Sequence, residues 1–150
     1  MPLPMQRLDD PFLPFGKAII NATRDLVCAY VFDFAAYLAI GAAGAVALER
    51  TIAYAGTDQT AMTVLHGLFV GVGYVEAASD NAFNVDAVTL AQAADAAAYQ
   101  ARGIGICLSP QTDTWEFLGT DLKLRLAGES VLYAGRGEDF AEQVRGALQP

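Results

Sequence analysis

Basic residues are scarce in this sequence of 150 residues. It holds nine Lys and Arg residues against seventeen Asp and Glu residues, which gives a formal net charge of −8. Because the neutralisation of phosphates requires clustered Lys and Arg side chains, we expect no nucleic-acid partner. The same balance argues against an anionic membrane surface. A content of 54% apolar residues excludes an intrinsically disordered chain.

A membrane-spanning segment is also missing from the sequence. The stretch from Phe34 to Leu48 carries no charge, but it is shorter than the roughly 20 apolar residues that a span needs. It also contains Gly41 and Gly44, which suit close packing inside a fold. The first residues show no basic region followed by an apolar one, so we expect no signal peptide and a cytoplasmic location.

Cysteine and histidine are rare as well. Cys28 and Cys107 lie far apart in apolar runs and form no Cys-x-x-Cys pair, so we expect two reduced, buried thiols. His66 is the only histidine, and no other His, Cys or carboxylate lies at ligand spacing from it. We therefore expect no metal site, and no cofactor is implied.

Short β-rich apolar runs alternate with Ala-rich helical patterns along the chain. This alternation is typical of βαβ units, and it predicts one α/β domain over residues 1–150, built on a parallel sheet of about five strands with flanking helices. Five strands cannot close an eight-stranded barrel but suffice for an open sheet. The predicted strands cover residues 26–32, 62–72, 85–90, 104–108 and 130–134. The predicted helices cover residues 15–25, 44–54, 76–83, 91–101 and 140–148, and residues 115–126 stay open between a short helix and an irregular crossing.

Two glycine-containing turns are candidate ligand sites. Gly135, Arg136 and Gly137 lie between a predicted strand and the last helix, where backbone N–H groups and a guanidinium could receive a phosphate. The alternative is an ordinary turn in which Arg136 pairs with Glu138 or Asp139. The second turn, Gly71-Val-Gly73-Tyr-Val-Glu76, has the setting of a dinucleotide-binding loop, but Glu76 replaces the third glycine and would face a pyrophosphate.

Three further residues are site candidates. His66 lies inside an apolar strand, where a structural, hydrogen-bonded histidine is the alternative to a catalytic one. We take His66 as the catalytic candidate. Asp33 and Thr89, which follow or lie within predicted strands, are the substrate-binding candidates.

Several segments resemble a known enzyme family. The first is Asp10-Pro-Phe-Leu-Pro-Phe-Gly-Lys-Ala-Ile-Ile-Asn-Ala-Thr-Arg-Asp-Leu-Val-Cys-Ala-Tyr30, which continues through Ala47-Leu-Glu-Arg-Thr-Ile-Ala-Tyr54. The others are Val85-Asp-Ala-Val-Thr-Leu90 and Val131-Leu-Tyr-Ala-Gly-Arg-Gly-Glu-Asp-Phe-Ala141. In this order they resemble orotidine 5′-phosphate decarboxylases of the second, longer bacterial type.

The resemblance implies a fold and a chemistry. Members of that family are (β/α)₈ barrels, usually homodimers, that convert orotidine 5′-phosphate to uridine 5′-phosphate in pyrimidine synthesis without a metal or organic cofactor. They use a lysine after the second strand and an Asp-x-Lys-x-x-Asp motif on the third. The lysine protonates the carbanion, and the carboxylates destabilise the substrate carboxylate.

This sequence departs from the family at those positions. Val31 stands where the first lysine is expected, and His66, Leu68 and Gly71 stand where the Asp, Lys and Asp of the motif are expected. Glu129 falls on the position of the phosphate-binding arginine. We therefore expect an incomplete or rearranged TIM-barrel derivative that is catalytically silent and retains weak binding of a nucleoside monophosphate through its phosphate.

Alternatives to this hypothesis remain. One is a structural or self-associating scaffold with no small-molecule ligand, and another is a dinucleotide-binding module. A third is an active enzyme that uses other residues: the acids Asp33, Glu76, Asp80 or Asp86 with Lys17 or Lys123. Since missing strands would leave open sheet edges that a second copy could pair with, we also expect a homo-oligomer.

Overall fold

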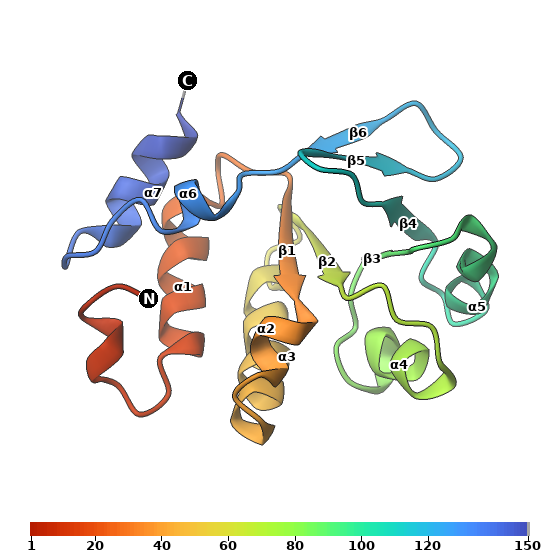
Figure 1. Cartoon of the computed structure of the whole chain (residues 1–150), viewed down its shortest axis with the longest axis horizontal. Coiled ribbons are helices and arrows are strands. Elements are labelled where there is room, and N and C mark those ends of the chain that lie inside the picture. Colours follow the sequence, from red (N-terminus) through yellow and green to blue (C-terminus); the bar gives the residue numbers. More distant parts are fainter. Residues whose placement is uncertain (150) are drawn as a thin grey trace.

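A computed structural model describes residues 1–149 (Figure 1). Its six strands are β1 (Ala29–Asp33), β2 (Met62–His66), β3 (Ala87–Thr89), β4 (Ile106–Ser109), β5 (Thr114–Phe117) and β6 (Lys123–Arg125). Its longer helices are α1 (Phe12–Thr23), α3 (Ala42–Gly56) and α7 (Phe140–Leu148). Its short helical segments are η1 (Met5–Arg7), α2 (Phe34–Leu38), α4 (Val72–Glu76), the π-helical turn η2 (Ala77–Asn81), η3 (Ala93–Asp95), α5 (Ala96–Gln100) and α6 (Glu129–Leu132).

The strands form one curled sheet in chain order, β1-β2-β3-β4-β5-β6. β1 to β4 are parallel, whereas β5 and β6 form an antiparallel hairpin on the edge of β4. Consecutive parallel neighbours are the arrangement of a barrel, whereas a doubly wound sheet reverses its strand order. The predicted α/β fold class, a partial barrel with flanking helices, is confirmed.

Two segments form a different type of element from the one predicted. Residues 130–134, predicted as a strand, are mostly helical in α6, because Val131 and Leu132 pack against the cluster formed by α1 and α7. Residues 115–126 form most of the β5–β6 hairpin instead of a helix or an irregular crossing. The apolar side chains of Trp115 and Leu124 face each other across that hairpin, and Gly119 adopts a φ of 79° in its turn. In both segments tertiary packing decides the local structure.

One face of the sheet, which we call the helix face, is covered by helices. Phe32, Leu65, Val88 and Cys107 form a transverse row across β1 to β4, and they pack against buried residues of α1, α3, α4 and α5. The predicted burial of Cys107 is confirmed, but that of Cys28 is wrong, because Cys28 lies in the exposed connection before β1.

The opposite face, the hairpin face, has an apolar core of its own. Val64, Ala87 and Leu108 from the parallel strands pack against Trp115 and Leu124 of the hairpin. In a closed barrel this face would point to the interior. Here the chain's own hairpin contributes to covering it.

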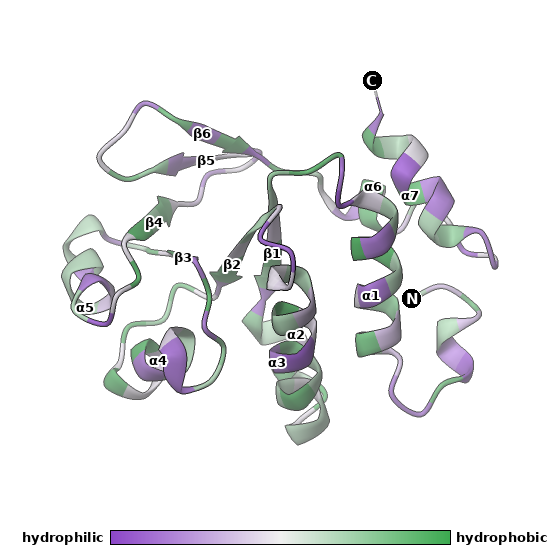
Figure 2. Ribbon diagram, turned by 180° about the vertical axis from the view of Figure 1, so that it is seen from behind, coloured by the Kyte–Doolittle hydropathy of each residue, from purple (hydrophilic) through white to green (hydrophobic). Residues whose placement is uncertain are grey.

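The last helix, α7, lies on the far side of α1 from the sheet (Figure 2). Phe15 and Ile19 of α1 pack against Phe140 and Val144 of α7, so α1 is enclosed between α3 and α7. Among residues 1–149, no helix is long and apolar enough to cross a membrane.

Candidate functional site

Three of the predicted site residues meet at the carboxyl ends of β1, β2 and β3. Asp33 and His66 are register partners on β1 and β2, and the Nδ1 atom of His66 lies 2.8 Å from the Oγ1 atom of Thr89 on β3. We call these three residues the strand-end row. The carboxyl ends of parallel strands are where barrel enzymes place their active sites. The structure therefore brings together the catalytic and substrate-binding candidates.

His66 is half-buried between Thr89 and the single tryptophan. The centroid of its ring lies 4.8 Å from that of Trp115, at an interplanar angle of 40°. Burial lowers the pKa of His66 below its usual value of 6.5, and the charge of Asp33 offsets part of this effect. The imidazole is therefore mainly neutral at pH 7, and it shares a hydrogen bond with the Thr89 hydroxyl.

The carboxylate of Asp33 has a structural role, because it caps a helix. Its Oδ1 atom accepts hydrogen bonds from the backbone N–H groups of Ala35 at 2.9 Å and Ala36 at 3.2 Å. Asp33 is thus the N-cap of α2 and satisfies two of the amide groups at the start of that helix. Among residues 1–149, no group of three or more His, Cys, Asp or Glu side chains could hold a metal ion.

Three of the four positions where the resemblance implies charged catalytic groups carry apolar residues, and the fourth carries His66. Val31 packs partly buried in the core of the hairpin face. Leu68 and Gly71 lie in the loop after β2, because the strand predicted to reach residue 72 ends at His66. The loop begins at Gly67, where a Cβ atom would lie 2.8 Å from the hydroxyl of Tyr74, and Leu68 has a φ of 56°. These features end the strand early.

Both lysines of the chain are engaged away from the strand-end row. The Nζ atom of Lys17 on α1 lies 4.9 Å from the ring centroid of Tyr54 on α3. Lys123 on β6 forms an ion pair with Glu116, with 3.1 Å between Nζ and Oε1. Neither ammonium group is placed to protonate a substrate held at His66.

The other acids considered for an alternative active site are dispersed. Glu76 forms an ion pair with Arg102, and Asp86 accepts hydrogen bonds from the backbone N–H and the hydroxyl of Thr63. Asp80 lies exposed in η2.

The glycines of the candidate dinucleotide-binding turn, Gly71 and Gly73, lie at the start of α4, which is five residues long.

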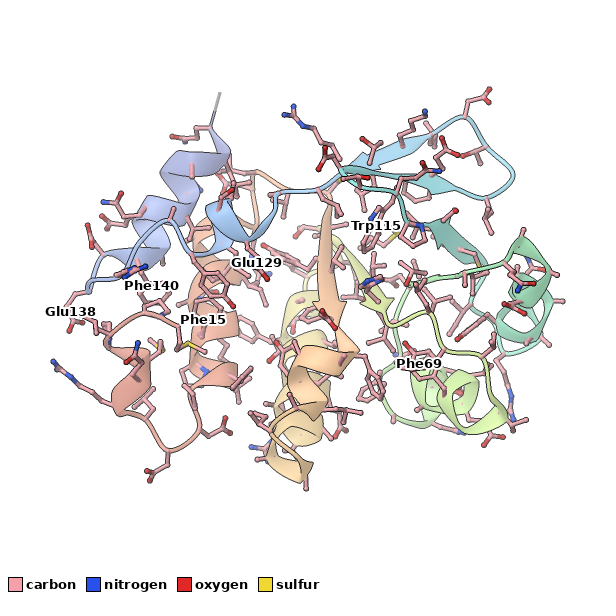
Figure 3. All side chains as sticks on the ribbon, in the orientation of Figure 1. Phe15, Phe69, Trp115, Glu129, Glu138 and Phe140 are labelled. Atoms are coloured by element: carbon pink, nitrogen blue, oxygen red, sulfur yellow. The ribbon has the colours of Figure 1, made fainter. Side chains whose placement is uncertain are left out.

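The segment Gly135–Gly137, which we call the terminal loop, lies apart from the strand-end row. The backbone N–H of Leu3 donates to the carbonyl oxygen of Arg136 at 2.9 Å, so the loop is tied to the N-terminal segment. Figure 3 shows Glu138 and Phe140 at the α7 end of the molecule and Trp115 beyond β1. The two sets of predicted site residues are therefore not brought into one site.

Close packing against α7 explains why residue 135 of the terminal loop is a glycine. A Cβ atom on Gly135 would lie 2.5 Å from the Cα atom of Phe140, so only glycine allows α7 to approach this closely. Arg136 makes no ion pair with any of residues 1–149 and lines a hollow of about 500 Å³ together with Tyr133 and the first residues of the chain. Glu138 and Asp139 follow the loop directly and oppose an anion there.

Sequence reasoning missed Trp115 as a site residue. Trp115 lies in the segment 115–126, for which the sequence pattern predicts no single type of element, so the pattern does not predict its contact with His66. The signal available was its uniqueness, since it is the only tryptophan in the chain.

No family model matches the chain. Three curated proteins match a part of it, and all are named orotidine 5′-phosphate decarboxylase. The protein from Herpetosiphon aurantiacus is 59% identical over 39 residues, which make up 26% of this chain and 15% of that protein. The protein from Parabacteroides distasonis is 46% identical over 46 residues, 31% of this chain and 16% of the relative. The protein from Thermomicrobium roseum is 48% identical over 50 residues, 33% of this chain and 18% of the relative.

A solved structure supports the same resemblance. The crystal structure of a putative orotidine-monophosphate-decarboxylase from Toxoplasma gondii aligns with a TM-score of 0.52 and 26% sequence identity, over 59% of this chain and 32% of that one. The chain therefore resembles orotidine 5′-phosphate decarboxylases in sequence and in fold. The matched stretches span less than a fifth of the curated relatives and about a third of the solved structure.

Proposed function

We propose that this chain is an orotidine 5′-phosphate decarboxylase-like α/β domain that is catalytically silent. The observation that carries this proposal is the location of its two lysines, one over the ring of Tyr54 and one paired with Glu116. The neutral imidazole of His66 is bonded to Thr89, and Asp33 caps α2. The strand ends thus offer no ammonium group to protonate a carbanion.

The size of the contributions that catalytic groups make to the reaction rate favours complete loss of activity. A positioned general acid or base contributes roughly 10²–10⁴ in rate, and preorganised charges usually contribute the largest single share of catalysis. Here apolar residues replace both kinds of group at Val31, Leu68 and Gly71. The remaining polar residues of the strand-end row cannot compensate for them.

Formation of uridine 5′-phosphate from orotidine 5′-phosphate tests this proposal. We expect the wild-type chain at high concentration to give the same rate as buffer. A rate above that of buffer that disappears in Lys17→Ala or Lys123→Ala would contradict catalytic silence, because it would show that a lysine reaches the substrate.

We further propose that the terminal loop binds the phosphate of a nucleoside monophosphate weakly. The supporting observation is that Arg136 lines a hollow together with Tyr133 and has no carboxylate partner among residues 1–149. Glu138 and Asp139 keep the expected affinity low. As part of this proposal the domain works in the cytoplasm, where its two free thiols stay reduced.

Calorimetric titration separates this binding from catalysis. Uridine 5′-phosphate and inorganic phosphate should both bind saturably to the wild type, and Arg136→Ala should abolish both signals. The matched control is Arg125→Ala, which removes a guanidinium from β6 and should leave binding unchanged. Failure of both ligands to bind the wild type would leave the scaffold alternative as the better account.

A further inference from the structure

A second hollow lies at the amino ends of β2, β3 and β4, so it is at the opposite end of the parallel strands from the strand-end row. Its volume is about 800 Å³, which is within the range of small-molecule sites. We call it the amino-end hollow. Its walls come from the second half of α3, the connection from α3 to β2, the residues that precede β3 and the first residue of β4. It is separate from both sets of site candidates described above.

The charge of the amino-end hollow is negative. Glu49 on α3 and Asp86 directly before β3 line it, and no Lys or Arg among residues 1–149 does. Neither carboxylate forms an ion pair with any of these residues. The net charge of −8 on the whole chain adds to the negative potential. A cationic ligand therefore complements the hollow, and an anionic one would be repelled.

The carboxylate of Asp86 is held in one orientation by Thr63, which is 2% exposed. Its Oδ2 atom accepts hydrogen bonds from the backbone N–H of Thr63 at 2.8 Å and from the Thr63 hydroxyl at 2.9 Å. The same hydroxyl accepts a hydrogen bond from the backbone N–H of Asp86 at 3.1 Å. The Oδ1 atom accepts none from residues 1–149. This oxygen is therefore available to a ligand, and little side-chain freedom is lost when the ligand binds.

The amino-end hollow also has an apolar wall. The apolar side chains that line it are Ile52, Met62, Phe83 and Ile106, and Ile106 is 40% exposed. The ring of Phe83 packs edge-on against that of Phe34, with 6.0 Å between centroids. A ligand with methylene groups can therefore remove apolar surface from water here, while its charged ends meet the carboxylates.

We propose that the amino-end hollow binds an aliphatic diamine, with one ammonium group at Glu49, the other at Asp86 and the carbon chain on the apolar wall. Two carboxylates on different elements and an apolar surface in one hollow match a ligand with two cationic ends and an apolar body. A metal ion fits less well, since no group of three or more His, Cys, Asp or Glu side chains among residues 1–149 could hold one. Both carboxylates are exposed, so the affinity is low, with a dissociation constant on the order of 1 mM.

NMR titration of the isotope-labelled full chain at about 50 mM NaCl tests the proposal. The probes are linear diamines with terminal amino groups and four, six or eight carbon atoms, each compared with the monoamine of the same chain length. At least one diamine should bind saturably and about fivefold more tightly than its monoamine, because its second ammonium group reaches the second carboxylate. The amide signals of Thr63 and Asn84 should shift, and those of the terminal loop should not. Binding that does not saturate, or affinities within about twofold for every pair of probes, would overturn the proposal.

Glu49→Gln and Asp86→Asn locate the two ammonium groups. Each variant removes one carboxylate, so each should bind the diamine and its monoamine with affinities within about twofold of each other. Asparagine at position 86 keeps a side-chain oxygen that can accept the hydrogen bonds from Thr63. The matched control is Glu142→Gln, which removes an exposed carboxylate of α7 with the same change in net charge and should retain the preference for the diamine. Circular dichroism confirms that each variant is folded. A preference that survives in folded Glu49→Gln or Asp86→Asn, or that is lost equally in Glu142→Gln, would overturn the proposal.

Discussion

The strand-end row and the terminal loop differ in how their residues come together. Thr89 lies 23 residues after His66, and it reaches the histidine because β2 and β3 are paired in register. The residues of the terminal loop are consecutive, yet the loop is shaped by contact with α7 and the first residues of the chain. The position of a polar residue at a strand end is thus determined by strand pairing in the sheet. The conformation of the glycine-rich terminal loop is determined instead by the helix that packs against it.

Trp115→Ala tests whether the hairpin holds the strand-end row together, and it should have the largest effect. Trp115 is 5% exposed and contacts both the core of the hairpin face and His66. Its truncation should lower the free energy of unfolding by about 3–5 kcal/mol in urea titrations. The control Leu122→Ala removes an exposed residue of the same hairpin and should change stability by less than about 0.5 kcal/mol. Equal effects would show that the hairpin does not cover the sheet.

Gly135→Ala tests whether packing determines the terminal loop. The new Cβ would lie 2.5 Å from the backbone of Phe140, which must shift, so we expect a loss of about 1–3 kcal/mol in the free energy of unfolding. Gly146→Ala, in α7 with open space around its Cβ, should instead stabilise the protein by about 0.5–1 kcal/mol. Equal changes in the free energy of unfolding for the two variants would contradict the close contact between Gly135 and α7.

Thr89→Val measures how much the hydrogen bond between Thr89 and His66 contributes to stability. Thr89 is 1% exposed, and valine has nearly its shape but leaves Nδ1 of His66 without a partner. A loss of about 1–2 kcal/mol is expected from thermal or urea unfolding. Thr57→Val is the matched control, because the Thr57 hydroxyl is exposed and donates only to the carbonyl oxygen of Ala53, and it should cost less than about 0.5 kcal/mol.

The charge state of His66 should have the smallest effect, and it can be observed directly. The pKa of His66 is lowered in the folded state, so the unfolded chain binds more protons below pH 6.5, and stability should fall as the pH drops through that value. Because the chain has one tryptophan and one histidine in contact, protonation of His66 should quench the fluorescence of Trp115, with a midpoint below 6.5. An unchanged midpoint in His66→Gln would mean that another group titrates.

The fold class could be predicted from the sequence because the parallel strands are short apolar runs between helical patterns. Four of the five predicted strands exist, although residues 67–72 are not part of β2. The β5–β6 hairpin could not be predicted, since its local pattern is weak and Trp115 is stabilised by contacts with residues of β2 and β3, which lie far away in the sequence. Val131 and Leu132 are predicted as part of a strand because of their local pattern. In the structure they are helical, because packing against α1 overrides this local preference.

The candidate site could be predicted only in part. The sequence points to His66 as the only histidine, inside an apolar strand, and to Asp33 and Thr89 as residues that follow or lie within predicted strands; the sheet register brings the three together. That Asp33 caps α2 depends on where the helix begins, which periodicity does not locate to a single residue. The separation of the terminal loop from the strand-end row depends on α7 packing against α1, a long-range contact with no local signal.

A single-turnover experiment tests the central claim, that the strand ends of this decarboxylase-like domain are built for packing and not for catalysis. The purified chain, in large excess over orotidine 5′-phosphate, is incubated at neutral pH while the release of carbon dioxide is followed. We predict release no faster than without protein, in the wild type and in His66→Gln alike. Conversion of the substrate by the wild type that is lost in His66→Gln would contradict the claim and assign a catalytic role to the strand-end row.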